Sequence, residues 1–390
     1  MQDSIWFRTL KPEEAAALAA ADPFPSRAEV VIVGAGMIGL AAAYYLSGKG
    51  VREICVLDRG PALGEASGAN AGGLWFAQQS LELGPLGQLA DHSRQLYKEL
   101  AGRFEFDFVS SGVLELIEEE RQLDQAEHRA EQVRQNGFRA ELLAPAQVRQ
   151  AEPALAHLDA AALLYPDDAH LHPARLAAAW VRLLRERGVR FCTNVEVERA
   201  GFPVGTNRGA IQTDALVIAA GAWTPLVTDV LGWRPPIRPI RGALLALPAQ
   251  PPGTLRHVVL TPRYYYWQLA GGPIAGGGSI EDVGFEPGLN QAVVRDIRSE
   301  LNRYLPALAE TPIECVWSGF RPFCEDSLPI IGQIPECGRT FVAAGHFRKG
   351  VMMAPITGRI IADLVVDGGS PVDLELFSPT RFASQSVARS

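Results

Sequence analysis

The apolar positions near the amino terminus follow a pattern that predicts a strand, a tight turn, a helix and a second strand. An apolar run at residues 30–33 leads into the motif Gly34-Ala-Gly-Met-Ile-Gly39, and an alanine-rich stretch with helical character follows it. A second apolar run at residues 54–57 ends at Asp58. This order is typical of a βαβ unit that binds a dinucleotide.

Each part of this unit has a predicted role. Gly34 allows the sharp turn, Gly36 lets the backbone approach a pyrophosphate, and Gly39 lets the helix pack closely on the strand. The helix amino terminus presents free N–H groups to phosphate, and Asp58 is expected to accept a hydrogen bond from a ribose hydroxyl. The alternative is an ordinary crossover whose glycines serve only packing, which the surrounding pattern disfavours.

The rest of the chain divides into segments with helical spacing and segments of short extended runs. The predicted helices cover residues 12–21, 86–104, 122–136, 173–187, 291–304 and 357–366, and the predicted strands include 189–193 and 214–220, the latter running into Gly221. Between residues 235 and 312, short β-branched or aromatic runs alternate with Gly and Pro, which predicts an antiparallel sheet.

The fold class expected from this pattern is α/β, with a Rossmann-like dinucleotide-binding domain and an α+β second domain built on an antiparallel sheet. The first domain is discontinuous, because the carboxy-terminal part supplies its last strand and helix. The expected boundaries are 1–28 for an amino-terminal extension, 29–105, 160–235 and 315–390 for the dinucleotide-binding domain, and 106–159 and 236–314 for the substrate or cap domain. The extension is expected to strap onto the surface or onto a partner.

Composition narrows the class of protein. The chain has 390 residues, 47% of them hydrophobic and 21% charged, which is ordinary for a soluble globular protein of two or three domain-sized units. A net charge of −8 without long blocks of like charge disfavours a nucleic-acid partner. The five cysteines form no CxxC pair, which favours a reduced compartment. We expect a cytoplasmic protein without a membrane span, since neither a signal peptide nor an apolar run of about 20 residues is evident.

Four regions of the chain carry motifs that occur together in one known group of enzymes. They are residues 33–39, 67–74, 217–225 and the carboxy-terminal pair 317–332 and 345–358. Together they resemble the FAD-dependent D-amino-acid oxidase superfamily, most closely the branch of glycine oxidase and hydrogen cyanide synthase. The resemblance covers nearly the whole chain and implies that the dinucleotide is FAD.

The resemblance also implies which residues bind the cofactor. Asp58 stands where many members have glutamate, Val195 is an alternative register for Val197, and Lys349 stands where many relatives carry asparagine and is expected to be exposed. No metal site is predicted. The implied cofactor-binding residues are Gly34, Gly36, Met37, Ile38, Gly39, Asp58, Arg59, Ala66, Ser67, Asn70, Ala71, Gly72, Gly73, Leu74, Val197, Ala220, Gly221, Trp223, Gly319, Arg321, Gly345, His346, Phe347, Arg348, Lys349, Gly350 and Val351.

Two arginines are the main candidates for binding substrate. Arg321 matches the arginine that grips the substrate carboxylate in the family, and a planar guanidinium can bind a carboxylate through two parallel hydrogen bonds. The alternative is a salt bridge between Arg321 and Glu325 or Asp326. Arg348 matches a second arginine near the substrate in members that resemble glycine oxidase.

The aromatic run at residues 264–267 falls where the family places a hydroxyl over the substrate. Alternation in a strand would send Tyr264 and Tyr266 to one face and Tyr265 and Trp267 to the other. Tyr264 and Tyr266 are the candidates for the catalytic site, and the sequence leaves open which face forms the pocket.

The implied reaction is oxidation of the C–N bond of a small amino acid by hydride transfer to flavin N5, which gives an imino acid. Glycine, a D-amino acid and an N-substituted amino acid are the expected substrate types. The reduced flavin would pass electrons to oxygen in an oxidase, or to a partner subunit in an amino-acid, opine or hydroxyproline dehydrogenase. The alternative functions are a non-catalytic flavin-binding subunit and an NAD-linked dehydrogenase. A homo-oligomer is the alternative to a complex with a different subunit.

Overall fold

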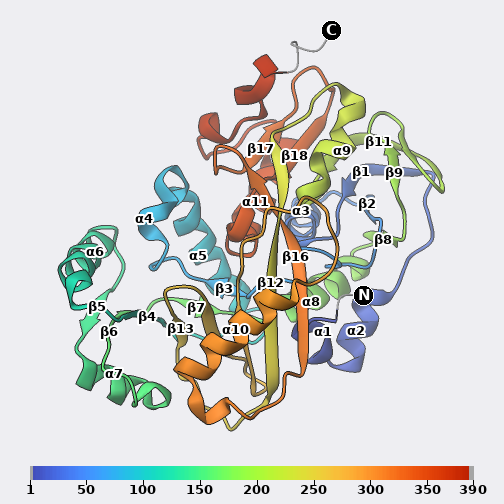
Figure 1. Ribbon diagram of the computed structural model, residues 1–390. Coiled ribbons are helices and arrows are strands. Elements are labelled where there is room, and N and C mark those ends of the chain that lie inside the picture. The colour runs from blue at the N-terminus through green and yellow to red at the C-terminus, as the bar shows by residue number, and fades with distance from the viewer. Residues whose placement is uncertain (1–2, 386–390) are drawn as a thin grey trace.

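The first apolar run of the chain forms the centre of a large sheet in the computed structural model, which describes residues 3–385 (Figure 1). Strand β1 lies between β2 and β11 and is parallel to both, and its last four residues are buried. Strands β10 and β9 extend the sheet beyond β11. In spatial order the main strands are β17 (Ile330–Gln333), β18 (Thr340–Ala344), β11 (Gly209–Ile218), β1 (Arg27–Val33), β2 (Ile54–Asp58) and β8 (Arg190–Thr193), with β10 (Val204–Thr206) and β9 (Val197–Arg199) attached.

Helices α3 (Met37–Gly48), α5 (Gly87–Ala101), α8 (Pro173–Glu186) and α11 (Gly350–Asp367) pack together beside this sheet. Helices α3 and α11 pack so closely that a Cβ atom at Gly358 would lie 2.4 Å from the carbonyl carbon of Ala41. The Trp180 ring of α8 stacks on Tyr44 of α3 with 5.6 Å between ring centroids. The predicted helix 173–187 and the predicted strand 189–193 are thus confirmed to within one residue.

Helix α11 begins at Gly350, seven residues before the predicted start at Thr357. Pro355 lies inside the helix and has no N–H for the carbonyl of Val351, four residues earlier. The Tyr97 hydroxyl of α5 donates to this carbonyl instead, and Ser93 donates to the next one, at Met352. Side chains of a neighbouring helix therefore supply hydrogen bonds around the proline, which the sequence pattern alone does not reveal.

The second sheet is built mainly from antiparallel pairs, as predicted, with one parallel pair between β4 and β13. Its longest ladder joins β12 and β16 from Ile237 opposite Cys324 to Ala246 opposite Cys315. In spatial order the strands are β16 (Cys315–Cys324), β12 (Ile237–Ala249), β15 (Pro273–Gly277), β14 (Tyr265–Gln268), β13 (Val258–Leu260), β4 (Val113–Ile117), β6 (Ala161–Tyr165) and β5 (Glu141–Leu143). A small third sheet pairs β3 (Gly73–Leu74) with β7 (Ala169–His170).

Two strands lie outside the parts to which the sequence assigned them. Strands β6 and β16 belong to the second sheet, whereas the expected boundaries placed residues 160–235 and 315–390 in the dinucleotide-binding domain. Continuous ladders with β4 and β12 decide their place, and strand pairing over such distances leaves no local sequence signal. We propose the same two-domain division with these two strands moved to the second domain.

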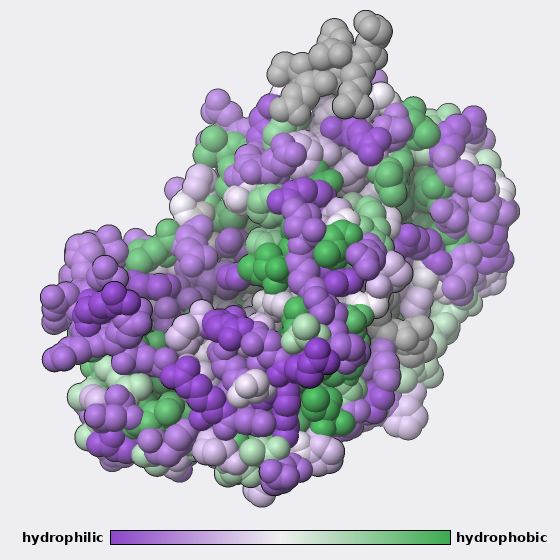
Figure 2. Space-filling model, in the orientation of Figure 1, coloured by the Kyte–Doolittle hydropathy of each residue, from purple (hydrophilic) through white to green (hydrophobic). Residues whose placement is uncertain are grey.

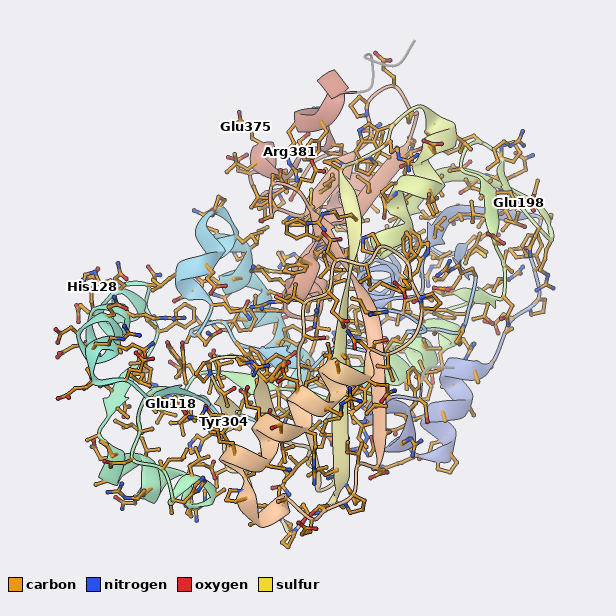
Figure 3. All side chains as sticks on the ribbon, viewed as in Figure 1. Glu118, His128, Glu198, Tyr304, Glu375 and Arg381 are labelled. Carbon is orange, nitrogen blue, oxygen red and sulfur yellow. The ribbon has the colours of Figure 1, made fainter. Side chains whose placement is uncertain are left out.

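Helix α10 (Gln291–Tyr304) covers one face of the second sheet, with the bounds predicted from the sequence. Its last residue, Tyr304, donates a hydrogen bond of 2.6 Å to Glu118, which directly follows β4, and Figure 3 shows the two side chains together. Helices α6 (Leu123–Gln135) and α7 (Pro145–Ala151) form a lobe beside β5 and β6, at the left of Figure 1.

The amino-terminal segment lies against α8 as two short helices, α1 (Ile5–Arg8) and α2 (Pro12–Ala19). Arg185 of α8 donates to the carbonyls of Ala17 and Ala20, where α2 ends. The remaining helices are α4 (Ser80–Leu83) and α9 (Thr224–Thr228). The face in Figure 2 is mainly hydrophilic, with separate apolar patches. Among residues 3–385, no helix is long and apolar enough to cross a membrane.

Candidate functional site

A cavity of about 1100 Å³ lies between the two large sheets. The carboxyl ends of β1, β2 and β11 form one wall, and residues of β12, β14 and β16 form the other. The edge where parallel strands end is the usual ligand-binding edge of such a sheet. The cavity therefore has a dinucleotide end at the first sheet and a second end against the antiparallel sheet.

The glycines at the dinucleotide end are required by close backbone contacts. Gly34 has a φ of +112°, and a Cβ atom there would lie 2.4 Å from the carbonyl oxygen of Ala219. A Cβ atom at Gly39 would lie 1.9 Å from the carbonyl oxygen of Gly34. Gly36 is the N-cap of α3, and the next N–H, of Met37, donates to the Ser67 hydroxyl at 3.0 Å. Turn, helix start and the Ser67 loop thus meet at one point.

Asp58 lies at the carboxyl end of β2 and lines the cavity. Its two carboxylate oxygens accept the N–H groups of Ala35, at 2.8 Å, and Gly60, at 2.9 Å. A carboxylate has about four acceptor positions, so two remain for hydroxyl donors. Burial raises the pKa of Asp58, and the two backbone hydrogen bonds oppose this rise. Beside it, the Arg59 guanidinium stacks 3.9 Å from the ring centroid of Trp223.

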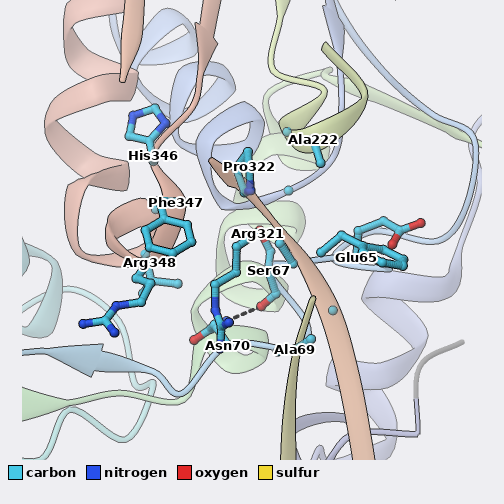
Figure 4. A pocket seen from close by; sticks show the side chains of 18 of the residues that line it. Glu65, Ser67, Ala69, Asn70, Ala222, Arg321, Pro322, His346, Phe347 and Arg348 are labelled. Carbon is cyan, nitrogen blue, oxygen red and sulfur yellow. Dashed lines mark hydrogen bonds between the residues drawn. The ribbon is translucent and has the colours of Figure 1, made fainter. Parts of the chain in front are cut away.

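Arg321 lies in the other end of the cavity, on β16, with the Asn70 side chain nearby in Figure 4. Its guanidinium donates to the carbonyl of Ser279 at 2.7 Å, and within residues 3–385 it forms no ion pair with a carboxylate. The sequence alternative of a salt bridge is wrong, because Asp326 pairs with Arg381 at 2.7 Å and Glu325 is exposed. Burial lowers the pKa of Arg321.

A glycine on the neighbouring strand makes room for this arginine. Gly242 of β12 faces the guanidinium, and a Cβ atom there would lie 2.1 Å from its nitrogens. The side chain of Arg321 therefore crosses the bare backbone of β12 to reach the cavity. Sequence reasoning missed Gly242, since its role depends on the register between β12 and β16.

The tyrosine that faces Arg321 is Tyr265, not the two predicted from the sequence. Tyr265 and Arg321 line the same cavity, and the Tyr265 hydroxyl opposes the lowering of the Arg321 pKa that burial causes. The Tyr265 ring meets the Trp75 ring edge-on, with 4.9 Å between ring centroids. Tyr266 is fully buried under α10, donates to the carbonyl of Ile297 at 3.0 Å and does not line the cavity. Tyr264 reaches the wall, but its hydroxyl donates to Asp296. Because α10 covers one face of the sheet, the pocket lies on the other, and that choice was open in the sequence.

The turn before α11 brings further predicted residues to the wall. His346 is buried, its Nε2 atom lies 3.0 Å from the Thr357 hydroxyl, and burial lowers its pKa to about 3. Arg348 is exposed and extends from the same turn (Figure 4), without a carboxylate partner among the described residues. Lys349 is partly buried, contrary to the expected exposure, and burial lowers its pKa.

Most of the predicted cofactor and substrate residues meet in this one cavity. Five do not line it: Gly39, Leu74, Tyr266, Gly345 and Lys349. Trp75, Gln78, Gln79, Gly242, Tyr265, Ser279 and Phe320 line it but were missed. The predicted residues that line it are Gly34, Gly36, Met37, Ile38, Asp58, Arg59, Ala66, Ser67, Asn70, Ala71, Gly72, Gly73, Val197, Ala220, Gly221, Trp223, Tyr264, Gly319, Arg321, His346, Phe347, Arg348, Gly350 and Val351.

No group of three or more His, Cys, Asp or Glu side chains that could hold a metal ion occurs within residues 3–385. The charged groups of the cavity include the guanidinium of Arg321 at one end and the carboxylate of Asp58 at the other, and its wall also carries Arg59, Glu65, Glu115, Glu196, Arg263, Glu281 and Arg348. This arrangement suits a ligand with hydroxyls at one end and a second ligand with a negative charge at the other.

The chain is similar to known proteins over most of its length. A family model described as FAD dependent oxidoreductase (DAO) matches residues 29–364. The chain is 30% identical to hydrogen cyanide synthase subunit HcnC of Pseudomonas aeruginosa, over 92% of this chain and 97% of that protein. It is 29% identical to glycine oxidase of Geobacillus kaustophilus, over 91% and 97%. The crystal structure of the latter enzyme superposes with a TM-score of 0.85, covering 92% of this chain and 99% of that one.

Proposed function

The chain belongs to the DAO family of FAD-dependent oxidoreductases, and on that premise we propose that it oxidises the C–N bond of a small amino acid that keeps a free carboxylate. Glycine, a D-amino acid or an N-substituted amino acid would fit this description. The observation that carries the proposal is Arg321, a guanidinium inside the cavity without a carboxylate partner among the described residues. A charge in such a place is costly unless a ligand pairs with it.

FAD is the cofactor, and the residues of the first sheet fit it. At Gly34 and Gly39 the backbone packs so closely that there is no room for a Cβ atom. The amino terminus of α3 suits a pyrophosphate. Asp58 has acceptor positions left for ribose hydroxyls. When bound, FAD supplies the hydride acceptor.

The chain's own contribution is to bind and orient the substrate. Arg321 would hold the carboxylate through two hydrogen bonds, which fixes the direction of the neighbouring C–N bond. The Tyr265 hydroxyl, next to the guanidinium, is placed to donate to the same carboxylate. Trp75 packs on the Tyr265 ring and keeps water from that wall.

No residue has to remove a proton during the oxidation. If the amine binds neutral, loss of a hydride from the α-carbon gives the protonated imino acid directly, and water then releases an oxo acid and ammonia or an amine. His346 is not needed as a base, since it is held by Thr357 and burial lowers its pKa to about 3. The substrate amine therefore sets the pH dependence of the reaction.

Two electron acceptors remain candidates. Oxygen would make the enzyme an oxidase, as the name of the glycine oxidase relative indicates for that protein. A partner subunit would make it a dehydrogenase, and the likeness to HcnC, which is named as a subunit, favours this as the second candidate.

One experiment tests the substrate and then the acceptor. The purified holoprotein is mixed without oxygen with glycine, sarcosine, D-alanine or D-proline, and bleaching of the flavin absorbance is recorded. Matched amines without the carboxylate, methylamine and pyrrolidine, serve as controls and are expected to leave the flavin oxidised. Equal bleaching by amines and amino acids, or none by any amino acid, contradicts the proposal. Hydrogen peroxide release in air then identifies an oxidase, and reduction of an added dye without peroxide identifies a dehydrogenase.

A further inference from the structure

The loop from Ser67 to Gly73 is held from behind by side chains of two other elements. The carbonyl of Gly68 accepts the Ser4 hydroxyl at 2.7 Å, the carbonyl of Ala69 accepts the Trp317 indole N–H at 3.3 Å, and the carbonyl of Asn70 accepts the Trp6 indole N–H at 2.6 Å. Three consecutive peptide carbonyls are thus fixed by long-range donors. Ser4 and Trp6 belong to the amino-terminal segment, which lies outside every motif of the cofactor site.

The fit between this segment and the loop is also steric. Trp6 is 1% exposed, its ring stacks on Trp267 at 6.2 Å and meets His172 edge-on at 4.9 Å. A Cβ atom at Gly72 would lie 3.3 Å from the Trp6 ring, and one at Gly68 would lie 2.8 Å from the Phe7 ring. The glycines of the loop therefore admit α1 at its back as well as a ligand at its front.

The fixed carbonyls determine where the loop's N–H groups point. In a trans peptide the C=O of one residue and the N–H of the next point in opposite directions. Because Trp317 binds the carbonyl of Ala69, the N–H of Asn70 points away from Trp317. Because Trp6 binds the carbonyl of Asn70, the N–H of Ala71 likewise points away from Trp6. Neither N–H has an acceptor within residues 3–385, and both residues line the cavity.

We propose that Trp6 is a positioning residue for FAD, which acts by aiming the N–H of Ala71 into the cavity through the carbonyl of Asn70. The segment around α1 is then a working part of the cofactor site and not only a strap on the surface. This inference rests on the cofactor and not on the proposed substrate, so FAD binding can test it without any amino acid.

The test compares two tryptophan-to-phenylalanine variants in the full chain. Trp6→Phe keeps an aromatic ring but removes the N–H, which leaves the buried carbonyl of Asn70 without its donor. Trp233→Phe is the matched control, because Trp233 is 5% exposed and its indole N–H has no partner among the described residues. The dissociation constant of FAD is measured by titrating the apoprotein, and the absorption spectrum of the bound flavin and the melting temperature of the apoprotein are recorded.

We expect Trp6→Phe to weaken FAD binding about tenfold, the value of one hydrogen bond, and to shift the flavin absorption bands. Trp233→Phe should change neither. Ser4→Ala, which removes the donor to Gly68, should act in the same direction by about threefold. An unchanged dissociation constant and spectrum in Trp6→Phe would overturn the proposal. So would a lower melting temperature of the apoprotein without weaker FAD binding, since Trp6 would then serve stability alone.

Discussion

The two ends of the cavity are built in different ways. The dinucleotide end is centred on one stretch of sequence, from Gly34 to Asp58, where the backbone packs most closely at Gly39 against the carbonyl of Gly34, and the Ser67 loop and Ala219 complete it. The substrate end is made of side chains on separate strands, with Arg321 on β16 and Tyr265 on β14. Backbone contacts tolerate almost no change, whereas side chains on a sheet can be exchanged singly. The first end should therefore fail completely when altered, and the second by degrees.

The largest effect is expected at Gly39. In Gly39→Ala the new Cβ atom would lie 1.9 Å from the Gly34 carbonyl oxygen, so helix and turn must separate. We expect the purified protein to contain no flavin and to melt at a much lower temperature. Gly48→Ala is the matched control in the same helix, since nothing lies within 4 Å of a Cβ atom there. Normal flavin content in Gly39→Ala would show that the dinucleotide end is less rigid than its backbone contacts imply.

A large but graded effect is expected at Arg321. In Arg321→Lys the charge remains but the two parallel hydrogen bonds to a carboxylate do not. We expect kcat/KM for the amino acid to fall about 1000-fold, which corresponds to about 4 kcal/mol, with full FAD content. Arg27→Lys, at an exposed ion pair with Asp214, is the control. An unchanged kcat/KM for the amino acid in Arg321→Lys would show that Arg321 does not bind the carboxylate.

The same contrast explains how much of the fold could be predicted from the sequence. The βαβ unit and helix α10 were recognised because their signals lie within a few residues of one another. The place of β16 was not, because its ladder with β12 joins segments about 80 residues apart. The start of α11 was missed for a similar reason, since Tyr97 of another helix satisfies the carbonyl that Pro355 leaves free.

The residues of the candidate site show the same contrast between local motifs and tertiary pairing. Gly34, Gly36 and Asp58 form a local motif and line the cavity as predicted. Tyr265 was missed because strand alternation identifies two faces but not which of them a helix covers. Gly242 was missed because only the strand register shows that Arg321 lies across it. Sequence alone thus predicts the parts of a site that are local and leaves open those that need tertiary pairing.

Gly242 offers a milder way to test the substrate end. In Gly242→Ala the Cβ atom would lie 2.1 Å from the Arg321 guanidinium, so the side chain has to move while its chemistry stays intact. We expect kcat/KM to fall about 30-fold, mainly through KM, because a displaced anchor still carries its charge. Flavin content should stay normal. Gly271→Ala, in the turn between β14 and β15, is the control, since its nearest contact would be 3.9 Å away. An unchanged KM in Gly242→Ala would mean that Arg321 can bind the substrate without crossing β12 at Gly242.

The smallest effect is expected at Asp168. A buried carboxylate lies at each end of the cavity. Asp58 accepts two backbone N–H groups at the dinucleotide end, and Asp168 accepts those of Ala77, at 2.7 Å, and Gln78, at 2.9 Å, behind the substrate wall. Burial raises the pKa of Asp168 to about 7. In the unfolded chain this carboxyl loses its proton near pH 4, so between about pH 4 and pH 7 the folded chain holds a proton that the unfolded chain has released. The stabilisation is therefore complete at low pH and is lost as the pH rises through about 7.

The raised pKa of Asp168 predicts a measurable decrease in the free energy of unfolding as the pH rises. From about pH 6 to about pH 8 we expect the free energy of unfolding to fall by about 1 kcal/mol through this group. Urea unfolding of the holoprotein at each pH measures it. Relative to the unaltered protein, this change with pH should be more positive by about 1 kcal/mol in Asp168→Asn, which cannot ionise, and the same in Asp167→Asn, whose carboxylate pairs with Arg139 near the surface and has a lowered pKa. The buried histidines, whose pKa values are lowered, add an opposite slope that is common to all three proteins. Equal slopes in all three proteins would assign the pH dependence to another group. The substrate wall would then depend on pH no more than the dinucleotide end does, and the difference between the two ends would lie in their backbone contacts alone.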